Sequence, residues 1–175
     1  ISSIDASLDP NQDGNLSDHV DIISMSLGVD CGGIYDSFCG PDDALSTAVN
    51  NAVNEGVVVV VAAGNSGPYE NTITSPGTAE KAITVGASDF NDGIADFSSR
   101  GPVYYNGQGK KPDIVAPGDY ICSSHAKIYD WFDGGLFGDA PLYCFDEEHV
   151  LHSGTSMSAP HISGAAALLK QKNPN

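Results

Sequence analysis

The chain has 175 residues, 41% of them hydrophobic and 17% charged, which predicts one folded domain and argues against a disordered chain. Its formal net charge of −16 would repel phosphate backbones, so we expect no nucleic-acid partner. The longest apolar run, residues 57–63, is too short to span a membrane and no signal-peptide pattern is present, so we expect no membrane partner.

The first half of the chain predicts a strand, a helix and a second strand. Residues 20–27 are mostly apolar, as in a buried strand. Asp42 and Asp43 indicate a helix start, because apolar residues then recur at helical spacing as far as Val53. Gly56 stands where a left-handed residue would end that helix. The continuous apolar run of residues 57–62 predicts a strand covered on both faces.

The second half predicts two more strands and a long helix, at residues 82–87, 113–116 and 155–170. Two long polar stretches, residues 5–18 and 123–149, are predicted to be loops. Strands and helices in this order, with fully apolar strands, predict an α/β fold with an open, mostly parallel sheet.

The four cysteines form two local pairs, Cys31 with Cys39 and Cys122 with Cys144. Neither pair has the spacing of a zinc site, so two disulfides are the favoured interpretation. Disulfides indicate an oxidising compartment and hence a secreted, extracellular protein. Four reduced, buried thiols in a cytosolic protein remain the alternative.

Residues 153–164, SGTSMSAPHISG, place Ser156 at the start of the last predicted helix. The N-terminus of a helix offers free backbone N–H groups and a positive dipole end. An oxyanion that develops beside Ser156 could therefore accept a hydrogen bond from its backbone N–H. An isolated serine there would be explained by helix capping alone, and the twelve-residue context is what favours chemistry.

Residues 154–160, GTSMSAP, resemble the nucleophile motif of the subtilisin-like serine proteases, the subtilases. Further segments match that family in the same order along the chain: SMSLG at 24–28, AAGNSG at 62–67, FSSRGP at 97–102 and KPDIVAPG at 111–118. The resemblance implies a three-layer α/β sandwich with a mostly parallel sheet. We expect residues 1–175 to be part of a subtilase catalytic domain, incomplete at both ends.

The resemblance also implies a role for each matching residue. Ser156 would be the nucleophile that attacks a polypeptide substrate, and Asn65 would donate a hydrogen bond to the oxyanion. The substrate-binding residues implied are Ser26, Leu27 and Gly28 on one side and Ala62, Ala63 and Gly64 on the other. No cofactor is expected for catalysis.

A serine nucleophile needs a base and an orienting carboxylate, which the family carries in an Asp segment and a His-Gly-Thr segment. Neither segment occurs in this sequence. We therefore expect the missing N-terminal part of the same domain to be a partner, and the isolated chain to be inactive. Apolar surface left uncovered could produce oligomers or a domain swap.

Asp9, Asn11 and Asp13 begin a D-x-N-x-D-G pattern that is typical of calcium loops, although no Glu completes it. A structural calcium site and a solvated Asx turn both remain open. Two alternatives to the protease hypothesis are a catalytically dead peptide-binding module, because the base is missing, and a calcium-dependent surface module.

Overall fold

A four-stranded parallel sheet is the centre of the computed structural model, which describes residues 1–29, 39–125 and 143–173. The strands are β1 (Ile22–Met25), β2 (Val58–Ala62), β3 (Ile83–Ser88) and β6 (Ile114–Pro117). They lie in the order β1-β2-β3-β6, and every neighbouring pair is parallel. All four strands were predicted from their apolar runs, so the mostly parallel α/β sheet is confirmed.

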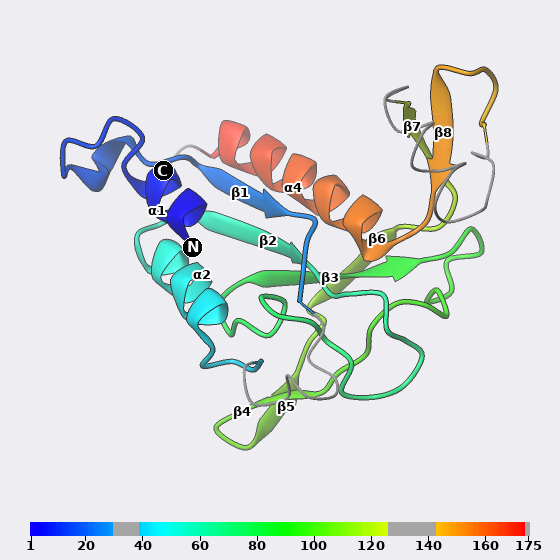
Figure 1. The fold of residues 1–175 in the computed structure, drawn as a ribbon, viewed down its shortest axis with the longest axis horizontal. Coiled ribbons are helices and arrows are strands. Elements are labelled where there is room, and N and C mark those ends of the chain that lie inside the picture. The colour runs from blue at the N-terminus through cyan, green and yellow to red at the C-terminus, as the bar shows by residue number, and fades with distance from the viewer. Residues whose placement is uncertain (30–38, 126–142, 174–175) are drawn as a thin grey trace.

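Strand β2 shows why the sheet needs cover on both faces. Val59 and Val61 pack into a core cluster with Val49 of helix α2 (Ala44–Asn54). Val60 faces the other way, into a second cluster with Ala159 of helix α4 (Thr155–Lys172). Figure 1 shows the sheet between these two helices. The expected three-layer sandwich is therefore present.

Helix α2 begins and ends where the sequence predicts. The Asp43 carboxylate accepts hydrogen bonds from the N–H groups of Leu45 and Ser46 at 2.9 and 2.8 Å, which caps the helix. At the other end Gly56 has φ +98°, and Val57 N–H donates to Ala52 O at 3.2 Å. This left-handed glycine turns the chain directly into β2.

The loop predicted over residues 5–18 is wrong at both ends. Helix α1 spans Ser2–Leu8, and a 3-10 turn spans Leu16–Asp18. In α1 only Ile4 is buried, where it joins the cluster beneath α2. A seven-residue helix that buries one side chain leaves no periodic apolar pattern to read in the sequence.

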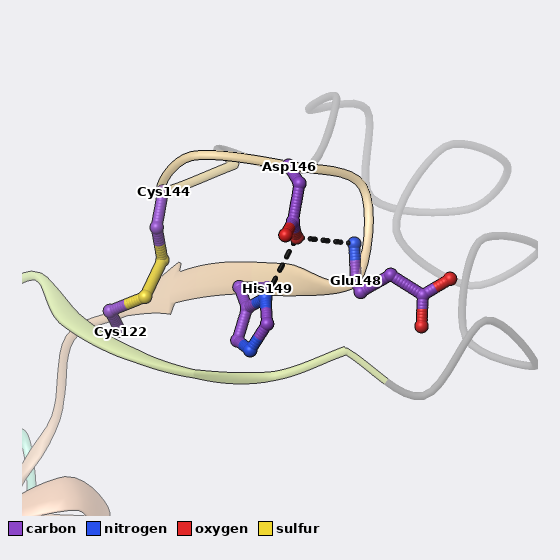
Figure 2. The surroundings of a disulfide bond; sticks show 5 residues. All are labelled: Cys122, Cys144, Asp146, Glu148 and His149. Atoms are coloured by element: carbon purple, nitrogen blue, oxygen red, sulfur yellow. Dashed lines mark hydrogen bonds and ion pairs between the residues drawn. A yellow bond between two sulfur atoms is a disulfide. The ribbon is translucent and has the colours of Figure 1, made fainter.

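The loop predicted over residues 123–149 also needs correction, because its ends are strands. β7 (Ile121–Ser124) and β8 (His149–His152) form an antiparallel pair. The predicted disulfide between Cys122 and Cys144 is observed next to them (Figure 2). Residues 126–142 lie outside the described part of the chain, as does Cys31, so the predicted pairing of Cys31 with Cys39 is not tested.

Asp146 closes the turn that leads into β8. Its carboxylate binds His149 Nδ1 at 2.7 Å and accepts a hydrogen bond from Glu148 N–H at 2.9 Å (Figure 2). The contact with His149 holds the pKa of Asp146 below its ordinary value. The turn between the disulfide and β8 is thus fixed by polar contacts as well as by the cross-link.

A second hairpin, β4 (Val103–Tyr105) and β5 (Gln108–Lys110), was not predicted. It turns through Asn106 and Gly107, which have φ +49° and +79°. The Tyr105 hydroxyl then donates to Thr78 O at 2.6 Å, which attaches the hairpin to the rest of the domain. Across the residues that the structure describes, no helix combines the length and the apolar character needed to cross a bilayer.

Candidate active site

Helix α4, which contains Ser156, begins near the carboxyl ends of the parallel strands (Figure 1). This edge of an open α/β sheet is where such folds commonly bind ligands. Ser156 is the second residue of α4, so its backbone N–H has no acceptor within the helix. Its hydroxyl donates to Ser26 O at 3.2 Å, in the chain that continues from β1.

A proline in the second turn of α4 explains why Ser26 holds this position. Pro160 has no N–H, so it cannot bond the carbonyl of Ser156 four residues earlier. The hydroxyl of Ser26 donates to that carbonyl instead, at 2.7 Å. Ser26 and Ser156 therefore bond each other reciprocally, and the first turn of α4 is fixed to the end of β1.

Asn65 follows β2 and is held by the first residue of α4. Its Oδ1 accepts hydrogen bonds from Thr155 N–H at 2.9 Å and from the Thr155 hydroxyl at 3.0 Å. Since Thr155 N–H can only donate, the oxygen of the amide must face the helix and Nδ2 must face away from it. The Thr155 hydroxyl also accepts from Gly64 N–H at 3.1 Å, which joins both segments.

Gly154 allows this close approach. A Cβ on Gly154 would lie 3.3 Å from Asn65 Nδ2, tighter than ordinary side-chain packing. Within the part of the chain that the structure describes, neither Nδ2 of Asn65 nor the backbone N–H of Ser156 donates a hydrogen bond to an acceptor outside the helix. Two donors at the same rim are what an oxyanion requires.

Ser156 and Asn65 share one cavity of about 270 Å³. Among the predicted substrate-binding residues, its lining includes Leu27, Gly28, Ala62 and Gly64. Of the others, Ser26 bonds to Ser156, whereas Ala63 is fully buried and does not line the cavity. The described residues around this cavity carry no charge, so its interior is neutral.

Sequence reasoning missed two residues of this cavity, Thr74 and Thr155. Thr155 was readable, because it stands beside Ser156 in the quoted motif and its hydroxyl reaches a strand end. Thr74 lies nine residues after Asn65 and carries no motif of its own. Only the fold brings it to the cavity.

A second cavity of about 380 Å³ opens on Ser156 and is lined by Ile121, Met157, Pro160 and His161, among others. His161 bonds the carbonyl of Met157 through Nδ1 at 2.8 Å, so this nitrogen is engaged within the helix. Within residues 1–29, 39–125 and 143–173, no histidine hydrogen-bonds to the Ser156 hydroxyl.

The predicted calcium ligands are engaged in turns. Asp13 N–H donates to Asp9 Oδ1 at 3.1 Å and to Asn11 Oδ1 at 2.9 Å, and Asn15 N–H donates to Asp13 Oδ1 at 2.8 Å. The described part of the chain holds no group of three or more His, Cys, Asp or Glu side chains placed to share a metal. The calcium site therefore stays a prediction.

A serine hydroxyl at a helix start, next to an oriented amide and at the edge of a parallel α/β sheet, is an arrangement typical of serine hydrolases. The comparison with protein families is consistent with this class: the model of the subtilase family matches residues 2–175. The chain belongs to the subtilase family.

Among curated proteins, the chain is 42% identical over 182 residues to the serine protease AprX of Bacillus subtilis (strain 168). The aligned region covers 100% of this chain and 39% of that protein. It is 36% identical over 163 residues to a subtilisin of Bacillus sp. (strain TA39), covering 88% of this chain and 32% of that protein. The chain thus spans well under half the length of these relatives.

Two solved structures resemble the fold. Sphericase matches with a TM-score of 0.61 and 34% identity, over 88% of this chain and 44% of that one. A protease named S41 Psychrophilic Protease matches with a TM-score of 0.60 and 32% identity, over 87% of this chain and 43% of that one.

Proposed function

We propose that residues 1–175 are part of the catalytic domain of a serine endopeptidase and supply its nucleophile and oxyanion donors. The observation that supports this most is the shared cavity: Ser156 and Asn65 line the same space of about 270 Å³. Membership in a family whose named relatives are proteases points the same way.

In this proposal the Ser156 hydroxyl oxygen attacks the carbonyl carbon of a peptide bond. A carbon–oxygen bond forms, the carbonyl electrons move to its oxygen, and the hydroxyl proton passes to a base. The oxyanion then accepts hydrogen bonds from Asn65 Nδ2 and Ser156 N–H. Thr155 matters here because its two bonds to Asn65 Oδ1 hold the amide in the donating orientation.

The segment Ser26–Gly28 would bind the substrate backbone as an added strand. Its acceptor nearest the nucleophile is Ser26 O, which receives the Ser156 hydroxyl in the structure. A substrate N–H that donates a hydrogen bond to Ser26 O would compete with the Ser156 hydroxyl for this acceptor. Binding would therefore release the hydroxyl proton toward the base at the moment when the scissile carbonyl arrives.

We propose that the base and its orienting carboxylate come from residues outside this sequence, in the missing part of the same domain. The cavity of about 380 Å³, which is lined by Ser156, Met157 and Pro160, would offer that base a route to the hydroxyl. Without that part the chain should show no triad-based hydrolysis. Its uncovered apolar residues, such as Leu168 and Leu169, are the reason for the predicted oligomer or domain swap.

We also propose that the protein is secreted. The disulfide between Cys122 and Cys144 supports an oxidising compartment, and a net charge of −16 suits a soluble exported protein. Catalysis in this proposal needs no cofactor, because every step uses side-chain and backbone groups.

The test uses the full-length protein that contains this chain. Wild type should cleave peptides and react with a fluorophosphonate probe at Ser156, and Ser156→Ala should abolish both. Asn65→Ala should lower turnover by about 10²–10³, the range established for this donor in a subtilisin. Ser163→Ala is the matched control on the same helix, and it should keep activity. Hydrolysis that survives Ser156→Ala would overturn the proposal.

One observation favours a second candidate, a catalytically dead peptide-binding module: among the described residues the Ser156 hydroxyl bonds only Ser26 O and no histidine. If the full-length protein binds peptides but neither cleaves them nor reacts with the probe, this second function replaces the first.

A further inference from the structure

The β7–β8 hairpin lies outside the four-stranded sheet and buries little. Its strands form a separate two-stranded sheet, and Val150 is the only buried residue in them. An isolated two-stranded hairpin is at best marginally stable in water. The disulfide between Cys122 and Cys144 joins β7 to the segment that precedes β8 (Figure 2). Polar contacts and this cross-link, rather than burial, therefore hold the hairpin together.

The base of the hairpin is bonded together at the start of α4. Ser153 Oγ accepts a hydrogen bond from Tyr120 N–H at 2.9 Å and donates to Asp119 Oδ1 at 2.7 Å. Gly154 N–H donates to Gly118 O at 2.7 Å. The chain that enters β7 and the chain that leaves β8 thus meet immediately before the helix that carries the nucleophile. A change in the path of β7 should therefore reach the first turn of α4.

Strand β7 is also a wall of the cavity of about 380 Å³ that opens on Ser156. Residues 121–123 line this space on the side of β7, and Ser156 lines it on the side of α4. Cys122 is exposed to solvent, and Cys144 is half-buried. The disulfide is therefore open to exchange with a dissolved thiol, and Cys122 itself belongs to the lining beside the nucleophile.

We infer that Cys122 and Cys144 are a redox-sensitive positioning pair for the nucleophile. In the disulfide form, β7 is held beside α4 and Ser156 is placed for attack. In the dithiol form, β7 is released and turnover falls. The inference depends on the proposed peptidase function, because it takes Ser156 as the nucleophile. The oxidant that it requires is a small-molecule or protein disulfide, such as glutathione disulfide.

The oxidation is a thiol–disulfide exchange. The thiolate of one cysteine attacks a sulfur of the oxidant, forms a mixed disulfide and releases one thiolate. The thiolate of the second cysteine attacks the protein sulfur of that mixed disulfide, which forms the Cys122–Cys144 bond and releases the second thiolate. The protein thiols give up two protons and two electrons, and the oxidant is reduced to two thiols. Because the cytosol keeps thiols reduced, a secreted peptidase would become fully active only after export.

The experiment uses the full-length protein with Cys31→Ser and Cys39→Ser, which leaves Cys122 and Cys144 as the cysteines of this chain. It is kept with glutathione disulfide or with a phosphine reductant, at a temperature where circular dichroism shows both forms folded. The endpoint of fluorophosphonate labelling counts competent Ser156 sites, and peptide hydrolysis gives kcat per labelled site and KM. Reduction should lower kcat per site about ten-fold or more, with a smaller change in KM, since a displacement of about 1 Å can cost about 10²-fold. Reoxidation should restore it.

The matched control adds Cys122→Ser and Cys144→Ser to the same background. It should show the low kcat of the reduced form under both conditions; if it does not fold, the redox comparison decides alone. An equal kcat per labelled site in the two redox states would overturn the inference, even if fewer sites were labelled after reduction, because the disulfide would then be only structural. That result refutes the switch and leaves the peptidase standing, whereas absent labelling of the oxidised protein refutes the peptidase itself.

Discussion

Loss of the disulfide between Cys122 and Cys144 should lower the stability of the protein by an amount that their separation sets. The two residues are 22 positions apart in the sequence. Joining residues at that separation removes loop-closure entropy from the unfolded chain equivalent to about 3.4 kcal/mol at 25 °C. Since each kcal/mol corresponds to about 2–4 °C in a domain of this size, the double variant Cys122→Ser/Cys144→Ser should melt about 7–14 °C lower.

Thermal unfolding followed by circular dichroism, with the protein kept oxidised, measures this difference. A reductant provides the matched control. It should lower the melting temperature of wild type by at least a similar amount, and the Cys122–Cys144 part of that decrease should be absent from the double variant. Because the double variant keeps Cys31 and Cys39, any further decrease on reduction would show that these two cysteines are also bonded.

Equal melting temperatures for wild type and the double variant would refute the reasoning. Such a result would mean that the β7–β8 hairpin opens independently of the sheet. The structure argues for coupling, because Val150 of β8 is 3% exposed and β8 leads within three residues into α4.

Three further predictions concern stability. Asp43→Ala should cost about 1–2 kcal/mol and Asp43→Asn less, because only the latter keeps an acceptor for the helix cap. Burial opposes ionisation of Asp43, but hydrogen bonds from Ser46, Ser75 and Gly40 outweigh burial and lower the pKa of its carboxyl group. The stability that the ionised carboxylate contributes is therefore present above about pH 4 and is lost as the pH falls through the lowered pKa of the folded state. A pH-independent difference in urea unfolding between wild type and Asp43→Asn would contradict this. Lys111→Met should lower the free energy of unfolding by about 1–3 kcal/mol. The reason is that Lys111 Nζ is buried and donates to Ala82 O and Asp113 Oδ2, both at 2.6 Å. An unchanged urea midpoint would count against this prediction. If the predicted calcium site exists, millimolar calcium should raise the melting temperature of wild type, and Asp9→Ala should abolish that increase. A melting temperature that calcium does not change would refute the site.

The parallel sheet was predictable because its burial is recorded locally in the sequence. Residues 57–62 are apolar at every position since both faces of β2 are covered, and that pattern needs no knowledge of distant residues. Helix α2 was predictable for a similar reason, because its cap, apolar face and terminal glycine follow one another within 14 residues, from Asp43 to Gly56.

The missed elements depend on contacts between distant residues or on signals that were overlooked. Ile121 pairs with His152, which is far away in the sequence, and no pattern in the neighbouring residues predicts this pairing. The β4–β5 hairpin was predictable in principle, since Asn106-Gly107 is a strong two-residue turn signal. Thr74 meets Gly28 only because the fold brings separate loops together.

For the candidate site, the family motifs indicated Ser156 and Asn65, and the structure brings both to one cavity. Motifs name residues but not their depth or their hydrogen bonds. The orientation of the Asn65 amide depends on two bonds from Thr155, and Thr74 lines the cavity close to Gly28 and Gly64. Both are properties of three-dimensional contact.

The proline in α4 has a consequence for when such a protein could become active. Because Pro160 leaves Ser156 O without its helical donor, the first turn of α4 depends on a hydroxyl that is 130 residues earlier in the chain. A helix formed alone would not fix the serine. In the proposed peptidase, Ser156 would reach its final position only after β1 has docked, so partly folded copies would be poor at digesting one another.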